Sequence, residues 1–506
     1  MEHQKGSDRN QIFFTTLEEM VPQDSFARII DLVVNSLPLK ALGFVNIQLN
    51  QEGNQPYYPG DLLKLIIYGQ RHGIRSSNKL AYGALINTEI MWLLGNLKPS
   101  ARTICYFRTK NEQAIKNAHK HFVKLLQQWD LIDGELIALD STKVRAQNSL
   151  KNNFNQKKID RHLEYLDGKI EEYLSQIKVL EDKPKKRLEV EDKINEVKAR
   201  KEHYNEIQER INHSKDGQVS TSDADARAVI KHRNIVEVGY NIQATVDAKH
   251  NLVIDTFCGG VTDRGDLGLG AKRAQDLLGV DKIDLLADKG FHNGADIAYC
   301  ERKGIRTFIP PSDQHHQKEE GFRKMDFDYD EHSDVYICPA GEVMAHELTY
   351  KKRNNRRNYK VKRYGTTKCD QCKLRDKCTT SPSGRKIERP NHQPNVERNN
   401  ARVARYGYYY RLRQQIVEPV FGVLKRQWHF DHVIHKGRSK VEMEVSVAML
   451  TYNLMRLVQI KGQEWVKKAL KDLILLHNWH NTQHRDWWMS MWNRMTMKKS
   501  LSYQAA

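Results

Sequence analysis

The chain lacks long hydrophobic runs. Nowhere in its 506 residues does an apolar stretch approach the roughly 20 residues that cross a bilayer. The first residues, MEHQKGSDRNQIFF, contain no apolar core of signal-peptide length. We therefore expect a soluble, intracellular protein that makes no contact with a membrane.

Cysteine is scarce as well. Seven cysteines in a chain of this length are too few and too clustered for the disulfide framework of a secreted scaffold. Four of them lie between residues 338 and 378, with spacings that favour a metal site. The others resemble ordinary buried residues, namely Cys105, Cys258 and Cys300.

Acidic residues are outnumbered by basic ones. Lys and Arg total 82 against 63 Asp and Glu, for a net charge of +19 and a pI near 9.4. This balance is expected where a protein holds a polyanion through counterion release, so nucleic acid is the leading partner. A basic protein that binds no nucleic acid has the same composition, and charge alone does not separate the two. The length allows roughly two to four domains.

Residues 1–130 have the pattern of a helical domain. Pro59 suits the first turn of a helix that continues through the apolar run 62–67 and stops at Gly73. Shorter helices are expected at 77–85, 88–94 and 99–109, a set of the size of a helix-turn-helix domain. Such a domain either binds DNA or only packs and dimerises, and no base-reading residue stands out.

An α/β pattern begins at residue 131 and continues to 310. Apolar runs at 136–139 and 283–287 lead into Asp140 and Asp288, as buried strands would that deliver a side chain at their tips. Two strands joined as a hairpin, two helices and a last strand complete the pattern; they are expected at 235–247, 252–258, 267–278, 294–303 and 305–309. Right-handed crossovers place the first and fourth strands side by side. We expect a mixed five-stranded sheet with helices, the ribonuclease-H-like α/β plan.

A helical hairpin is expected to interrupt this core at 151–213. Apolar residues recur there at spacings of three and four with charges between them, as in a coiled coil. Pro184 breaks the register, after which the stripe resumes, so the chain should turn back on itself. The hairpin could pair with another subunit, lie on DNA, or pack only on itself and the core.

Asp140 and Asp288 are candidate metal ligands. If their strands are neighbours, the two carboxylates converge at one edge of the sheet. Two Mg²⁺ ions about 4 Å apart can stabilise the attacking and leaving oxygens of a phosphodiester displacement, and they require oxygen ligands. Each aspartate alone could equally start a turn or cap a helix.

A third acid should come from a helix within 401–428, in the segment 401–461. Arg411, Glu418 and Lys425 are spaced by seven and share one helical face, which suits a metal ligand flanked by phosphate contacts. A surface ladder of ion pairs would have the same spacing. Pro419 predicts a kink or a helix start beside Glu418.

Three ordered segments resemble the catalytic motifs of DDE-type transposases of bacterial insertion sequences: Leu-Asp-Ser-Thr at 139–142, Leu-Ala-Asp-Lys-Gly-Phe at 286–291, and 410–425. In that family the third motif reads Tyr, two residues, Arg, three residues, Glu, six residues, Lys. Tyr410, Arg413, Glu418 and Lys425 reproduce it with one extra residue between Arg413 and Glu418. The segments 222–227 and 238–241 also resemble the family, without a physical role that the sequence indicates.

The resemblance implies an enzyme that nicks DNA at the ends of its element and joins the freed 3′ hydroxyl to target DNA. Asp140, Asp288 and Glu418 would be catalytic and would bind two Mg²⁺ (or Mn²⁺) ions. The expected DNA contacts are Tyr410, Arg411, Arg413, Lys425 and Lys143. The partner would be double-stranded DNA, both terminal inverted repeats and target, bound by a homo-oligomer in the bacterial cytoplasm at the nucleoid.

Three other functions stay open. A ribonuclease-H-like nuclease would cleave DNA without joining it. A catalytically inactive descendant would bind DNA without metal and without cleavage. A zinc-stabilised assembly protein would use the hairpin to form oligomers indifferent to DNA.

A basic, loop-rich insertion is expected at 311–400, followed after the catalytic helix by a basic, Trp-rich tail at 462–506. The insertion contains one Cys-x-x-Cys pair and two outlying cysteines, which suit tetrahedral Zn²⁺ in a closed structural site, although the last gap is wider than usual. Free reduced thiols are the alternative. The four candidate ligands are Cys338, Cys369, Cys372 and Cys378.

Overall fold

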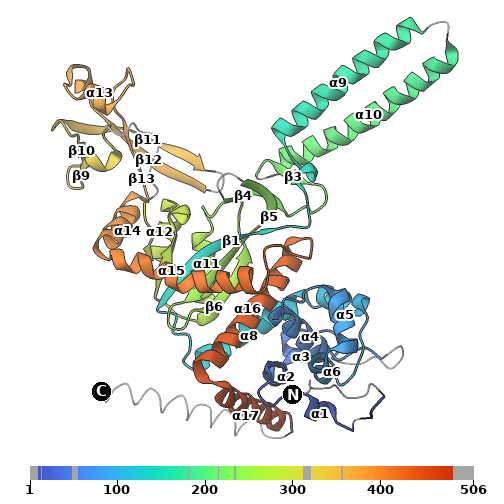
Figure 1. Ribbon diagram of the computed structural model, residues 1–506. Coiled ribbons are helices and arrows are strands. Elements are labelled where there is room, and N and C mark those ends of the chain that lie inside the picture. Colours follow the sequence, from blue (N-terminus) through green and yellow to red (C-terminus); the bar gives the residue numbers. More distant parts are fainter. Residues whose placement is uncertain are drawn as a thin grey trace, which may run out of the picture. The chain divides into compact units, whose positions relative to one another are not determined.

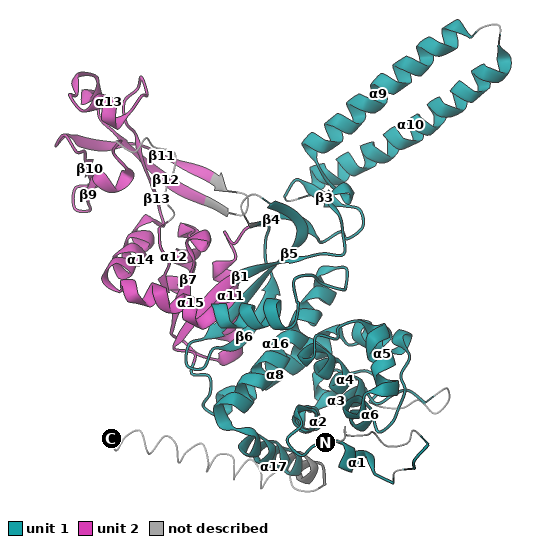
Figure 2. Cartoon of the chain, in the orientation of Figure 1, with its two compact units in different colours: residues 1–133, 141–261, 418–506 teal, residues 134–140, 262–417 magenta. Residues whose placement is uncertain are grey.

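The computed structural model describes residues 10–12, 14–47, 55–180, 183–214, 216–232, 235–311, 321–354 and 357–482 (Figure 1). The chain forms two compact units, which Figure 2 colours separately. Unit 1 comprises residues 1–133, 141–261 and 418–506, and unit 2 comprises 134–140 and 262–417. In this described part, no helix is long and apolar enough to cross a membrane.

The N-terminal part of unit 1 is helical. Ser25 caps the second helix by accepting a hydrogen bond from the Ala27 amide. Pro59 occupies the first turn of the fourth helix, as its sequence predicts, and that helix buries its whole apolar run. The helices are α1 (Leu17–Met20), α2 (Phe26–Ser36), α3 (Leu39–Leu42), α4 (Pro59–Arg71), α5 (Ser77–Ile86), α6 (Thr88–Leu93), α7 (Ala101–Lys110) and α8 (Glu112–Gln128).

A mixed sheet has the strand order β4-β5-β1-β7-β8, with β6 paired to β5. Its parallel pairs are β1 with β7 and β7 with β8, and its antiparallel pairs include β4 with β5 and β5 with β6. The strands are β1 (Leu136–Arg145), β4 (Arg227–His232), β5 (Ile235–Asp247), β6 (Leu252–Cys258), β7 (Ile283–Ala287) and β8 (Ile305–Phe308). This mixed α/β arrangement is consistent with a ribonuclease-H-like core.

Two details of the sheet differ from the sequence prediction. The described residues form six strands rather than five, because 227–232 adds β4 beside β5. Strand β1 does not end at Asp140 but continues to Arg145, with Thr142 and Val144 buried between more exposed neighbours. The fully apolar run covers only the half of β1 that pairs with β7. In the second half, buried and more exposed residues alternate, as in a strand with one face toward solvent.

Helices α9 (Gln156–Val179) and α10 (Pro184–His213) lie side by side as an antiparallel hairpin in unit 1 (Figure 1). Pro184, where the predicted register breaks, is the first residue of α10. At the base of the hairpin the short strands β2 (Asn153–Asn155) and β3 (Gln218–Ser220) pair. A small core there joins strands and helices; it contains Phe154, Ile159, Ile207, Ile211 and Val219.

Unit 2 contains a second sheet where the sequence predicts a loop-rich segment. Its antiparallel order is β13-β12-β11-β10-β9. One residue from each of β10 to β13, with the residue before β9, forms its core: Phe327, Tyr336, Met344, Tyr364 and Ile387. The loop prediction is wrong here because the dense Lys and Arg between those residues hide a half-buried strand pattern. The strands are β9 (Asp328–Asp330), β10 (Val335–Ile337), β11 (Val343–Asn354), β12 (Arg357–Gly365) and β13 (Ile387–Pro390).

The helices of unit 2 are α11 (Leu267–Leu278), α12 (Gly294–Arg302), α13 (Arg375–Cys378), α14 (Gln393–Arg405) and most of α15 (Gly407–Gly422). Asn399 of α14 links this helix to the end of β8. Its side chain accepts from the Thr307 hydroxyl and the Ile309 amide and donates to the Ile309 carbonyl. Helix α14 is thereby tied to an edge strand of the sheet.

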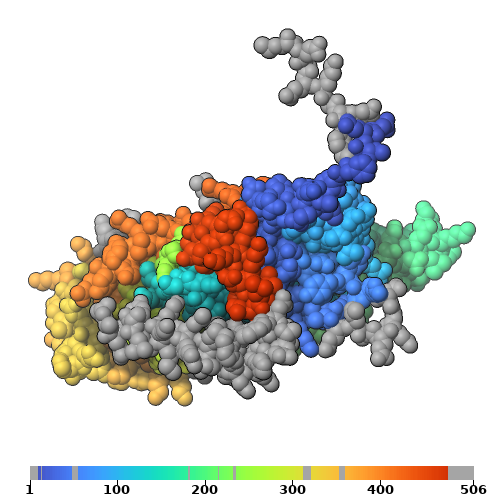
Figure 3. Space-filling view, turned by 90° about the horizontal axis from the view of Figure 1, so that it is seen from below, coloured from blue at the N-terminus to red at the C-terminus, as the bar shows by residue number. Residues whose placement is uncertain are grey.

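The last described helices return to unit 1. Helix α16 (Arg438–Lys461) packs on α4, α8 and β6, and the Asn453 amide both donates to and accepts from the Val253 backbone. Helix α17 (Gln463–Thr482) packs on α2, so the C-terminal and N-terminal helices adjoin in Figure 3. The first part of the predicted tail is therefore helical, and 483–506 lies outside the described residues.

Candidate active site

Each of the two candidate aspartates directly follows one member of the last residue pair between β1 and β7. The last parallel partners of β1 and β7 are Leu139 and Ala287. Asp140 comes next within β1, Asp288 directly follows the end of β7, and both belong to unit 2. The predicted adjacency of these strands is confirmed. Asp288 also accepts a hydrogen bond from the Lys289 amide at 2.8 Å, so it starts a turn as well.

Helix α15 delivers a side chain to each aspartate. The Tyr410 hydroxyl donates to Asp288 Oδ1 at 3.0 Å, and the Arg413 guanidinium forms an ion pair with Asp140. Burial, reinforced by the negative charge of Asp288, raises the pKa of Tyr410, which keeps its hydroxyl protonated as a donor. Tyr410 and Arg413 are predicted as DNA contacts; the structure shows both on the carboxylates.

Arg413 is only 8% exposed. Its side chain is therefore largely shielded from solvent where it pairs with Asp140. Its guanidinium carbon lies 5.6 Å from the centre of the Tyr410 ring. Its Nε atom is buried and has no hydrogen-bond partner in the part of the chain that the structure describes.

Glu418 lies on the same helix and is exposed. It is the first residue of the last segment of unit 1, whereas both aspartates are in unit 2. The helix neither starts nor stops at Pro419, which stands inside α15, so the predicted helix start is wrong. The irregularity comes later, as a π-helical turn at Val423–Gln427 that contains Lys425. A wider turn changes the periodicity, so the spacing of seven no longer places Lys425 on the face of Arg411 and Glu418.

Lys143 lies on β1, three residues after Asp140. Its ammonium group donates to the Ser141 hydroxyl at 2.8 Å, on the same side of the strand. Arg411 is exposed on α15. Both cations therefore belong to elements that carry a candidate acid.

The four clustered cysteines line one cavity in unit 2 together with Phe322, Phe327 and Met344. Burial raises the pKa of the Cys378 thiol, and the charges of the other three thiols would raise it further. Gly384 has φ +73°, and a Cβ there would lie 2.7 Å from Cys369 Cβ, so the turn over this cysteine needs glycine. Across the described ranges, however, no three His, Cys, Asp or Glu side chains are grouped so that they could hold a metal ion.

The segment 222–227 has a structural role that the sequence does not reveal. Asp223 accepts from the Tyr240 hydroxyl and, at 3.1 Å, from the Gly437 amide. Asp225 accepts from the Arg438 amide at 2.8 Å. Gly437 and Arg438 form the start of α16, so this acidic segment caps a helix that lies more than 200 residues later in the chain. Only the three-dimensional fold identifies such a cap.

Two segments of the chain match known protein families. Residues 15–110 match a family described as transposase domain (DUF772), and residues 337–458 match the family described as transposase DDE domain. The first match covers helices α1 to α7, and the second contains Glu418 and the four clustered cysteines. No curated protein and no solved structure matches the chain. Both matches are to transposase domains, and together they support a DDE-type transposase of an insertion element.

Proposed function

We propose that this transposase cleaves DNA at the ends of its element and joins the freed 3′ hydroxyls to target DNA, on a ribonuclease-H-like core. Asp140, Asp288 and Glu418 are its catalytic carboxylates. The observation that carries the proposal is the neighbouring position of Asp140 and Asp288 after the last β1–β7 pair. Further support comes from α15, which contains Glu418 and contacts both aspartates through Arg413 and Tyr410.

The donor set suits divalent magnesium or manganese. Asp140 and Asp288 offer carboxylate oxygens, which hard cations prefer. Arg413 already forms an ion pair with Asp140, so a bound ion would share this carboxylate with the guanidinium. Two bound ions would stabilise charge on the attacking and leaving oxygens of the phosphodiester. Asp140, Asp288 and Glu418 would hold them.

The other residues of the site bind and orient. Tyr410 fixes one oxygen of Asp288, which leaves the second oxygen to a ligand. Arg413 neutralises Asp140. Arg411, Lys425 and Lys143 are cations near the acids in sequence, and we assign them to the DNA backbone. No serine or tyrosine nucleophile is required, since a positioned water or 3′ hydroxyl attacks phosphorus directly.

The proposed partner is double-stranded DNA, bound by more than one copy of the chain. The N-terminal helices that match the transposase domain are proposed to bind the element ends. The insertion at 311–400 and the tail from 462 add basic surface to that contact. The helical hairpin at 151–213 keeps its three alternatives, namely subunit pairing, DNA contact, or packing within unit 1.

Cleavage is tested on a duplex made from the DNA that flanks the reading frame, where the proposal expects an inverted repeat. The protein, Mg²⁺ and end-labelled DNA should yield a nick at the repeat boundary with a 3′ hydroxyl, and a chelator should abolish it. A duplex with scrambled ends is the matched substrate control. Binding without any metal-dependent nick would overturn the proposal in favour of an inactive DNA-binding descendant.

Tyr410→Phe is expected to lower the single-turnover cleavage rate roughly tenfold. A hydrogen bond to a charged group contributes about 1.5–3 kcal/mol, and its loss leaves Asp288 less well oriented. The control is Tyr408→Phe, because Tyr408 is exposed and packs edge-on against Tyr409. Equal cleavage rates for the two variants would show that the Tyr410 hydroxyl does not contribute to catalysis.

The cysteine cavity is the second proposal. We propose that Cys338, Cys369, Cys372 and Cys378 bind one structural Zn²⁺ when the metal is present. In support, all four thiols line one cavity, and the backbone turns at Cys369–Cys372 bring Cys372 N within 3.4 Å of Cys369 O. A closed four-thiolate site has no vacant position, so this zinc would take no part in DNA cleavage. It would instead stabilise the sheet that contains β11 and β12.

Elemental analysis of the purified protein should find one zinc per chain, and Cys372→Ser should lower that content. The variant should also melt at a lower temperature, since zinc binding contributes folding free energy. Cys105→Ser is the control, because Cys105 is distant in sequence from the cluster. It is exposed, so the prediction that it is buried is wrong, whereas Cys258 and Cys300 are buried as predicted. A zinc-free protein whose stability does not respond to added zinc would contradict the site and favour free thiols.

A further inference from the structure

The segment 429–437 connects the π-helical turn after α15 to the start of α16. It begins beside the buried Trp428 and contains three histidines within unit 1. The Phe430 amide donates to the Leu424 carbonyl at 2.9 Å. The segment thus continues directly from the helix that carries Glu418. Contacts that fix the segment therefore also restrain the end of that helix.

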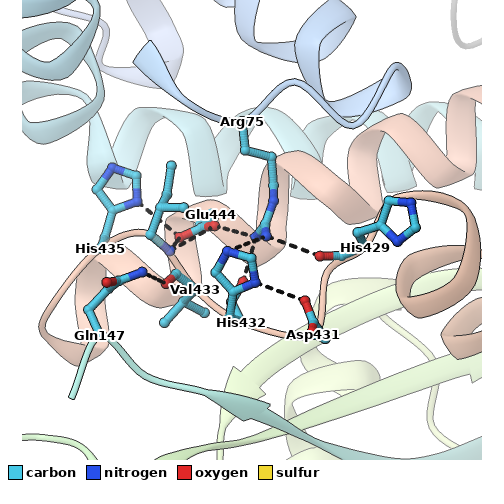
Figure 4. A network of polar contacts seen from close by, with 9 residues as sticks. Arg75, Gln147, His429, Asp431, His432, Val433, His435 and Glu444 are labelled. Carbon is cyan, nitrogen blue, oxygen red and sulfur yellow. Dashed lines mark hydrogen bonds and ion pairs between the residues drawn. The ribbon is translucent and has the colours of Figure 1, made fainter. Parts of the chain in front are cut away.

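Arg75, from the loop after α4, holds this segment on one side (Figure 4). Its guanidinium donates to the His432 carbonyl at 2.6 Å and to the His429 carbonyl at 3.1 Å. It also lies 4.6 Å from the centre of the Phe430 ring. The planar guanidinium group donates to two carbonyls and stacks on a ring at the same time. The single ammonium group of lysine cannot replace these contacts.

Glu444 of α16 completes the contact. It pairs with Arg75 at 2.9 Å, and the two side chains are only 6% and 8% exposed. Its second oxygen accepts from the Ile434 amide at 3.1 Å and lies 3.0 Å from His435 Nδ1. One carboxylate therefore neutralises the arginine and binds the same segment.

Strand β1 holds the segment on the other side. The Arg145 amide donates to the Asp431 carbonyl at 2.9 Å, and the Val433 amide donates to the Arg145 carbonyl at 2.8 Å. These bonds form a parallel bridge between Arg145 and His432. The Gln147 side chain adds a bond to the Val433 carbonyl at 2.9 Å. Strand β1 is the strand on which Asp140 lies.

We propose that Arg75 is a positioning residue for DNA cleavage: it clamps the segment 429–435 against β1 and so fixes the helix that carries Glu418. This inference rests on the proposed function. Arg75 lies in the first transposase match and Glu444 in the second, so the clamp joins the N-terminal helices to the catalytic part of the chain. Positioning groups matter because small displacements of catalytic side chains cost large factors in rate.

The test compares Arg75→Lys with Gln147→Ala in the full-length protein. Arg75→Lys should lower the single-turnover cleavage rate about 100-fold and raise the Mg²⁺ concentration needed for half-maximal rate. Gln147→Ala removes one bond to the same segment without burying a charge, and should lower the rate roughly tenfold. DNA affinity, measured without metal, should remain that of the unmodified protein.

A second readout needs neither metal nor activity. Hydrogen exchange in the metal-free protein should quicken at the Arg145 and Val433 amides in both variants. Arg28→Lys is the matched control, since Arg28 also donates to backbone carbonyls, those of Glu18, Val21 and Pro22, within the same helical domain. It should change neither the exchange at residues 145 and 433 nor the cleavage rate.

The outcomes separate the two proposals. If the unmodified protein does not cleave element ends, the proposed function fails, whatever the exchange data show. If it cleaves and Arg75→Lys leaves exchange at 145 and 433 unchanged, the clamp is overturned. If exchange quickens while rate and metal dependence stay the same, the clamp exists but has no positioning role.

Discussion

Asp288→Asn is expected to lower strand cleavage at least about 1,000-fold while the protein stays folded. The amide has nearly the shape of the carboxylate and can still accept from Tyr410 and the Lys289 amide, the contacts that the aspartate makes. It lacks the negative charge that holds a divalent ion. The loss should therefore appear in single-turnover cleavage and not in circular dichroism or DNA affinity.

Asp284→Asn is the control on the same strand. Asp284 lies four residues before Asp288 on β7, and its carboxylate forms an ion pair with Arg306 at 2.6 Å and 2.7 Å. Because Arg306 is largely exposed, this pair contributes little to stability, and the variant should cleave at the normal rate. Comparable loss in both variants would show that Asp288 acts through the strand and not as a metal ligand.

Glu444→Gln is expected to destabilise unit 1 by about 3–5 kcal/mol, because it leaves the buried Arg75 charge without its partner. Glutamine retains an oxygen for the Ile434 amide, so the lost charge is the main change. A chain with two compact units need not unfold in a single transition. The measurement is therefore hydrogen exchange of the α16 amides under native conditions, where global opening sets the protection.

Removing both charges separates stability from positioning. The double variant Arg75→Met with Glu444→Leu should recover most of the lost stability, since a buried ion pair can often be replaced by packed apolar residues without loss. It should not recover cleavage, because methionine cannot donate to the His429 and His432 carbonyls. Full activity in a stable double variant would show that the Arg75–Glu444 pair stabilises the protein but does not position catalytic groups.

Several elements of the core follow from local patterns in the sequence. The ranges expected for β5, β6, β7 and α11 coincide with those in the structure, because continuous apolar strands and a 3.6-residue period leave little choice. The sequence does not mark the second half of β1, nor β4. Their residues are partly exposed, and only pairing with β5 makes them strands.

In the candidate site, too, the sequence predicts some residues and leaves others unmarked. Asp140 and Asp288 are predictable because parallel neighbours align the residues that follow their apolar runs. The contacts of Tyr410 and Arg413 are not, since they join residues 122 and 273 positions apart. Arg75 and Glu444 are separated by 369 positions, and neither belongs to a recognisable motif. Long-range side-chain contacts of this kind depend on how the elements pack.

A transposase joins DNA as well as cutting it, and one reaction tests directly whether this chain does so. A labelled duplex with a pre-cut element end and a free 3′ hydroxyl is incubated with the protein, Mg²⁺ and unlabelled plasmid, and the products are separated under denaturing conditions. We expect the label to become covalently attached to plasmid strands, and to remain unattached with Asp288→Asn. Efficient nicking of the element end with no label in the plasmid would contradict the account and identify the protein as a nuclease.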